Sequence, residues 1–126
     1  MRNQKGEMRN SIAHTKAKAF AVRIVKFAQF LQNERKEHVL SKQILRSGTS
    51  IGANVHEANY AQSKADFITK MQIALKECHE TEYWLKLFSR TAIIDEETYK
   101  KMSQASGKIR RILIASLNTA KGNLDK

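Results

Sequence analysis

The sequence predicts an all-α protein, an antiparallel up-down-up-down four-helix bundle, and three observations lead to this prediction. The 126 residues contain no proline, four long segments repeat apolar residues at alternating steps of three and four, and short polar connectors separate these segments. Steps that average 3.5 residues are typical of helices packed nearly antiparallel at shallow angles. Short connectors make successive helices antiparallel, so a four-helix bundle is the simplest architecture.

The first two helices are expected over about residues 11–33 and 41–61. The first carries an apolar stripe made by Phe20, Ile24, Phe27 and Leu31. The second carries a stripe made by Ile44, Ile51, Val55 and Ala58, and Ser41 is a candidate cap for its first turn. Residues 1–10 lack a periodic apolar face, so we expect a mobile basic tail there.

The third and fourth helices are expected over about residues 65–90 and 96–121. The stripe of the third comprises Phe67, Met71, Ala74, Cys78, Thr81, Leu85 and Phe88. The stripe of the fourth comprises Tyr99, Met102, Ser106, Ile109, Leu113, Ser116 and Ala120. Ser63 and Asp95 precede these helices and are suited to capping them. Residues 122–126 are expected to form a second tail. The chain from 11 to 121 is thus one domain, which fits its length and its 41% hydrophobic content.

The segment Arg46–Asn54, RSGTSIGAN, combines small and hydroxyl residues in a way that suggests a phosphate loop. A Walker-type loop needs a Gly-Lys-Ser/Thr sequence after a strand, whereas here Ala53 follows Gly52 and no strand precedes. Gly48 and Gly52 lie one turn apart on one helix face, with Ser47 and Ala53 beside them. We therefore interpret the strip as a place where another helix packs closely, with a kinked or broken helix as the alternative.

Positive charge is concentrated at the two ends of the chain. The formal net charge is +11; residues 1–26 carry seven Lys or Arg against one Glu, and residues 96–121 carry six against two. Such a distribution suggests a polyanionic partner, RNA or DNA, although a merely solubilising surface is an equal alternative on charge alone. The expected phosphate contacts are Arg9, Lys16, Arg23, Lys26, Lys101, Lys108, Arg110 and Arg111.

No catalytic or metal-binding motif emerges from the sequence, and no cofactor is expected. A ferritin-like di-metal centre needs Glu-x-x-His, and none of the four histidines has a glutamate three residues before it. The acidic and histidine residues left as candidates for an enzyme are Glu57, Glu77, His79 and Glu80. Cys78 lies on an apolar stripe, where a cysteine is usually an inert hydrophobic residue. A lone cysteine and the lack of an uncharged membrane-spanning run favour a cytoplasmic location with no membrane contact.

Residues 45–88 resemble a bacterial four-helix bundle protein family first noticed as reading frames in intervening sequences of large-subunit ribosomal RNA genes. The resemblance lies in the segments Leu45–Ser47, Gly48, Ser50–Asn54, Glu57-Ala58, Ser63, Asp66-Phe67, Ile73–Glu77 and Glu80–Leu85. The outer two helices match only in their apolar pattern. The family's usual small residue or glycine after Glu57-Ala58 is replaced here by Asn59-Tyr60.

The resemblance implies a homo-oligomer, a ring of five subunits like the related accessory proteins of diversity-generating retroelements. Those relatives are basic, bind nucleic acid and associate with a reverse transcriptase. It also implies a binding or scaffolding role without catalysis.

Roles for several polar and aromatic residues follow from a hairpin turn at residues 62–64, which brings Arg46 level with Glu80. We expect Arg46 to pair with Glu80, and Asn54 and Glu57 to join a hydrogen-bond network between helices or subunits. Tyr83, Trp84 and Phe88 are candidates for an exposed aromatic patch used in assembly, with ordinary core packing as the alternative.

Three functions remain open at this point. The first is a non-enzymatic oligomeric scaffold that binds RNA or DNA through phosphate contacts. The second is an adaptor between proteins that binds no nucleic acid, and the third is a metal-dependent or hydrolytic enzyme. Binding to RNA and DNA at increasing salt separates the first two, because phosphate contacts weaken steeply with salt.

Overall fold

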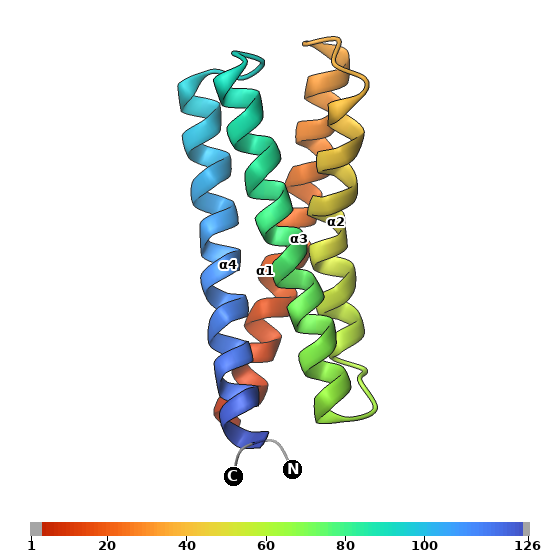
Figure 1. The fold of residues 1–126 in the computed structure, drawn as a ribbon, viewed down its shortest axis with the longest axis vertical. Coiled ribbons are helices and arrows are strands. Elements are labelled where there is room, and N and C mark those ends of the chain that lie inside the picture. Colours follow the sequence, from red (N-terminus) through yellow and green to blue (C-terminus); the bar gives the residue numbers. More distant parts are fainter. Residues whose placement is uncertain (1–3, 125–126) are drawn as a thin grey trace.

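The computed structural model describes the backbone of residues 4–124 and the side chains of residues 10–122. It contains four helices, α1 (Gln4–Asn33), α2 (Leu40–Ala58), α3 (Lys64–Arg90) and α4 (Glu96–Leu124), and no strand in residues 4–124. Figure 1 shows the helices side by side with alternating direction, and the start of α1 and the end of α4 lie at the same end of the bundle. The predicted all-α antiparallel four-helix bundle is confirmed.

Three helix boundaries differ from the predicted ones by three residues or more. α1 begins at Gln4 instead of near residue 11, and α4 continues to Leu124 instead of 121. Extending an existing helix adds one hydrogen bond per residue without a new nucleus, so these ends stay helical without an apolar stripe. α2 ends at Ala58 instead of residue 61, because the chain turns there: the amide of Tyr60 donates to the carbonyl of Glu57 at 3.0 Å.

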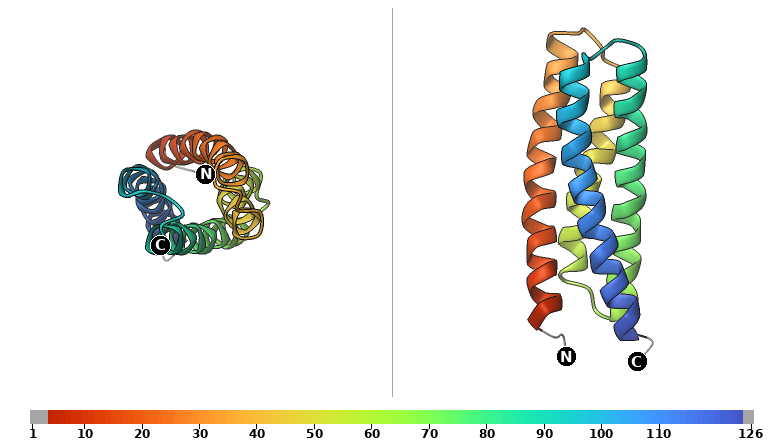
Figure 2. Two further views of the ribbon diagram at one scale, coloured as in Figure 1. Left: turned by 90° about the horizontal axis from the view of Figure 1, so that it is seen from above. Right: turned by 90° about the vertical axis from the view of Figure 1, so that its left-hand side faces the viewer.

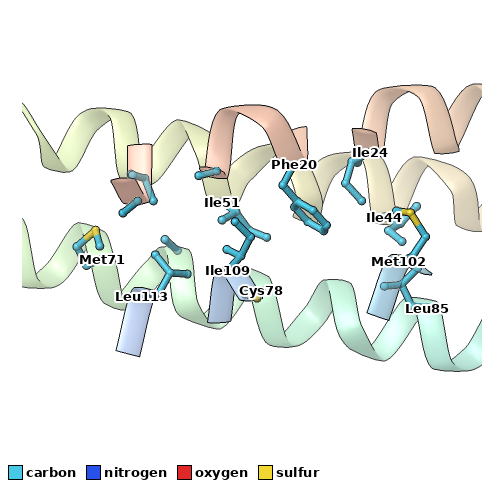
Figure 3. Packing of buried hydrophobic residues seen from close by; sticks show 14 of the residues in the cluster. Phe20, Ile24, Ile44, Ile51, Met71, Cys78, Leu85, Met102, Ile109 and Leu113 are labelled. Atoms are coloured by element: carbon cyan, nitrogen blue, oxygen red, sulfur yellow. The ribbon is translucent and has the colours of Figure 1, made fainter. Parts of the chain in front are cut away.

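Apolar side chains from all four helices meet along the bundle axis (Figure 3). The predicted stripe of α1 is at most 6% exposed at each of its four positions. In α3 the core begins with Ile68 and Met71, whereas Phe67 is only partly buried against it. From Met71 onward the predicted stripe of α3 is buried as a whole.

The starts of α3 and α4 are capped by side chains. The Ser63 hydroxyl accepts a hydrogen bond from the Asp66 amide at 3.0 Å, and the Asp95 carboxylate accepts one from the Thr98 amide at 2.8 Å. α2 differs from the expectation, because Ser41 lies inside the helix and is buried. Glu37 in the preceding connector accepts a hydrogen bond from the Ser41 amide at 2.7 Å and so satisfies one of the amides that the helix start leaves unpaired.

None of the four helices, over the part of the chain that the structure describes, is long and apolar enough to cross a lipid bilayer.

Candidate nucleic-acid interface

A groove of about 270 Å³ lies between α1 and α4. Figure 2 shows these two helices, the first and the last of the chain, as neighbours in the bundle. Phe20 and Ile109, each at most 5% exposed, contribute to the lining. Four basic residues also line it, two from each helix, and we call them the basic quartet: Lys16, Arg23, Lys101 and Lys108.

The helical repeat explains why the quartet gathers in one place. Lys16 and Arg23 are seven residues apart, which is about two turns or ~10 Å along α1, so both point to the same side of the helix. Lys101 and Lys108 have the same spacing on α4. The antiparallel arrangement therefore places two rows of two cations along opposite sides of one groove.

Little negative charge opposes the quartet. No Asp or Glu lines the groove. Lys101 contacts Glu97 at 3.2 Å, but both side chains are more than 60% exposed, so solvent screens this pair strongly. Within residues 10–122, Lys16, Arg23 and Lys108 form no ion pair. The groove can therefore attract an anion at several points at once.

The other predicted phosphate contacts lie outside this groove. Lys26 and Arg111 are exposed on α1 and α4 but do not line it. Arg110 donates from Nε to the Glu82 carboxylate at 3.0 Å, so a residue of α3 neutralises its charge. Its expected role in phosphate binding stays a prediction, and Glu82 competes there with a phosphate for the charge of Arg110. The side chain of Arg9 lies outside the described residues.

The glycine strip of α2 faces α1. A methyl group at Gly48 would lie 2.7 Å from Cγ1 and Cγ2 of Ile24, and one at Gly52 would lie 3.3 Å from the carbonyl oxygen of Ala17. Ser47 is fully buried on a different side, where the Thr81 hydroxyl of α3 donates to its Oγ at 2.9 Å. Ala53 is exposed and takes no part in this packing, because its position on the helix turns it to solvent.

Arg46 joins α2 to α3 through two carboxylates. Its guanidinium contacts Glu80 and also Glu77, the latter at 3.1 Å. The indole of Trp84 donates a hydrogen bond to the Glu80 carboxylate at 3.1 Å. This bond is the largest of the effects that lower the pKa of Glu80, and the neighbouring Arg46 lowers the pKa further. The Glu80 bond is likewise the main cause that raises the pKa of Arg46.

Asn54 and Glu57 separate in the structure instead of sharing one network. The Asn54 amide donates within its own helix to the carbonyl of Ser50 at 2.8 Å. Within one chain this bond to the preceding turn replaces the expected link between helices, and a link between subunits stays a prediction. Glu57 does bridge two helices, because Lys70 of α3 contacts it at 3.1 Å.

The predicted aromatic patch is smaller than expected. Tyr83 is 59% exposed, and its ring meets that of half-buried Trp84 edge to face at 5.1 Å between centroids. Phe88 is fully buried, and its ring packs on that of Phe27 at 6.3 Å between centroids. The prediction that Phe88 belongs to an exposed patch is therefore wrong, and the alternative of core packing holds. Its position on the apolar stripe of α3 turns it into the core.

The candidate enzyme residues do not converge. Among residues 10–122, no group of three or more His, Cys, Asp or Glu side chains could hold a metal ion. Glu77 and Glu80 are engaged by Arg46, and His79 is exposed. Cys78 is fully buried, and burial, assisted by the charge of Glu82, raises the pKa of its thiol to about 12. A thiol with that pKa is a poor nucleophile near neutral pH.

The fold and this groove define a basic, all-α four-helix bundle with an anion-attracting surface along its first and last helices. The chain belongs to the 23S rRNA-intervening sequence protein family, whose pattern matches residues 9–115. It is also similar to a crystal structure from Bacteroides thetaiotaomicron, described as a protein of unknown function from the S23 ribosomal protein family. The two share 54% identity and a TM-score of 0.86 over 87% of this chain and 98% of that one. No curated protein is similar enough to count as a match. The family resemblance inferred from residues 45–88 is thus confirmed.

Proposed function

We propose that this protein is a non-enzymatic, homo-oligomeric, cytoplasmic scaffold that binds RNA through the phosphate backbone. The observation that carries the proposal is the basic quartet in the groove between α1 and α4. The family description refers to 23S rRNA, so RNA is the first ligand to test and DNA the second.

The groove binds phosphates and does not read bases. Its cations are flexible Lys and Arg side chains, which supply charge and hydrogen bonds to phosphate oxygens. The aromatic residue in its lining, Phe20, is 4% exposed and offers no free face for a base to stack on. We expect affinity to depend strongly on salt and weakly on sequence.

The test is fluorescence anisotropy with a labelled single-stranded RNA, titrated at several salt concentrations. The variant Lys16→Gln/Lys108→Gln removes two cations from the groove. The control Lys42→Gln/Lys86→Gln removes two exposed cations from α2 and α3. If each lost phosphate contact counts fully, the slope of log K against log salt becomes shallower by about 1.4 in the groove variant.

The control variant should keep the slope of the wild-type protein. Equal losses in the two variants would show that the charge acts diffusely and not through the groove. An absence of binding to RNA and DNA at low salt would exclude the scaffold proposal and favour an adaptor between proteins.

The non-enzymatic part of the proposal is supported by the burial of Cys78 and by the ion pairs of Glu77 and Glu80. The homo-oligomeric part is supported by the Tyr83–Trp84 pair, because aromatic side chains left on a surface are enriched at protein interfaces. A ring of five copies is the assembly that we propose.

A further inference from the structure

Two histidines from different helices meet on the surface between α1 and α2. Nε2 of His14 lies 3.1 Å from Nδ1 of His56, although the residues are 42 positions apart in the sequence. His14 is half-buried and His56 is exposed. The groove between α1 and α4 does not include either residue.

The helix packing brings the two imidazoles close together. Gly52 lies one turn before His56 and faces the backbone of Ala17 at close range, so α1 and α2 approach each other next to the pair. The ring of Tyr60 contacts that of His56, at 5.2 Å between centroids. The close approach of α1 and α2 therefore brings the two nitrogens within hydrogen-bond distance of each other.

Two imidazole nitrogens at this distance can share one cation. A proton between them makes the hydrogen bond, with one ring as donor and the other as acceptor. If both rings turn a lone pair toward one point beside the line that joins the two nitrogens, a metal ion can bind both there. For metal–nitrogen bonds of about 2.1 Å, nitrogens 3.1 Å apart subtend an angle of about 95° at the metal.

We propose that His14 and His56 form a bidentate site for a divalent transition metal cation that bridges α1 and α2. The angle fits adjacent positions of square-planar or octahedral coordination, and imidazole ligands suit Cu²⁺ and Ni²⁺. Water completes the coordination, because no further His, Cys, Asp or Glu in the described part joins the pair to make a larger cluster. A hard cation such as Mg²⁺ finds no oxygen ligand set here.

The test is isothermal titration of the tag-free full chain with NiCl₂, together with thermal denaturation. We expect one Ni²⁺ per chain and a higher melting temperature, because the ion links two helices only in the folded state. His14→Gln and His56→Gln should each weaken Ni²⁺ binding as much as the double variant, because a single imidazole cannot chelate. The double variant His38→Gln/His79→Gln, which alters two exposed histidines outside the pair, should bind like the wild-type protein.

Circular dichroism of each variant without metal checks that the bundle is folded. Paramagnetic broadening by Ni²⁺ should affect the imidazole NMR signals of His14 and His56 before those of His38 and His79. Equal weakening by the His38/His79 control, or no Ni²⁺ binding by the folded wild-type chain, would show that the pair is a hydrogen-bonded contact between helices and nothing more.

Discussion

Gly48 lies on the face of α2 that packs against α1, where a methyl group would come within 2.7 Å of two carbons of Ile24. Those carbons are the first atoms beyond a branched Cβ and cannot swing away freely. We predict that Gly48→Ala lowers the free energy of unfolding by about 1–2 kcal/mol, although alanine favours helix by up to ~1 kcal/mol. Urea denaturation measures the difference.

The matched control is Gly107→Ala in the middle of α4. There a methyl group would meet only the flexible ends of Arg111 and Arg110, at 3.4 and 3.6 Å. This substitution should stabilise the protein by about 0.5–1 kcal/mol through helix propensity. Similar effects at both glycines would contradict the close-packing role of Gly48.

Cys78 provides a second prediction at this scale, concerning alkaline pH. Its folded pKa of about 12 lies above the value of about 8.5 in an unfolded chain, so the unfolded state loses the thiol proton first. The stabilising contribution is complete below pH ~8.5 and is lost as the pH rises toward 12. Above pH ~8.5 the free energy of unfolding should fall more steeply, by up to about 1.4 kcal/mol per pH unit, in the wild-type protein than in Cys78→Ala. Urea denaturation between pH 8 and 10.5 compares the slopes, and parallel slopes would contradict the prediction.

The sequence predicts some site residues better than others, for a physical reason. The seven-residue spacing of Lys16 and Arg23 places both on one helix side, and the same holds for Lys101 and Lys108. Spacing alone does not show that Glu82 of another helix neutralises Arg110, nor that His14 meets His56. Such pairs depend on the rotation of two helices about their own axes, which the apolar stripes fix only approximately.

Between elements, the ion pairs of Arg46 tie α2 to α3. Arg46 is 49% exposed and Glu80 is 35% exposed, so solvent weakens the pair. We predict a coupling energy of about 0.5–1 kcal/mol in a double-mutant cycle of Arg46→Ala and Glu80→Ala, measured by urea denaturation and reduced by 1 M NaCl. The i,i+4 pair Glu97–Lys101 is the control and should give about 0.3–0.5 kcal/mol. A coupling of zero at Arg46 and Glu80 would contradict their role as a link between helices.

The presence of each helix was easier to predict from the sequence than the residues at which it begins and ends. Each helix has an apolar stripe, and burial of that stripe drives packing whatever the end residues are. The ends depend on local bonds instead. Ser63 and Asp95 cap their helices with their own side chains, whereas α2 receives its bond from Glu37 in the connector, four positions before Ser41. A carboxylate acting from outside the helix has no fixed sequence signature.

For the whole molecule, short connectors predict the antiparallel order of the helices, but no comparable feature of the sequence predicts the groove. It lies between α1 and α4, the first and last helices, which no connector joins. The residues that line it depend on the distance between these two helices and on the rotation of each helix about its own axis. The charge excess at both chain ends nevertheless indicates which helices carry the basic surface, because a closed four-helix bundle makes its first and last helices neighbours.

The formal charge of +11 per chain leads to opposite salt effects on the two proposed associations. Copies of the chain repel one another, and salt screens that repulsion, so the homo-oligomer should become more stable between 0.05 and 0.5 M NaCl. RNA binding should weaken over the same range, because the release of counterions from the RNA contributes less free energy when the salt concentration is higher. Sedimentation velocity without RNA and anisotropy with RNA measure the two trends.

Tyr83→Glu should shift the first measurement toward monomer and leave RNA binding by each chain in place, since Tyr83 does not line the groove. A species that stays monomeric at every salt concentration would contradict the assembly without affecting the phosphate-binding proposal.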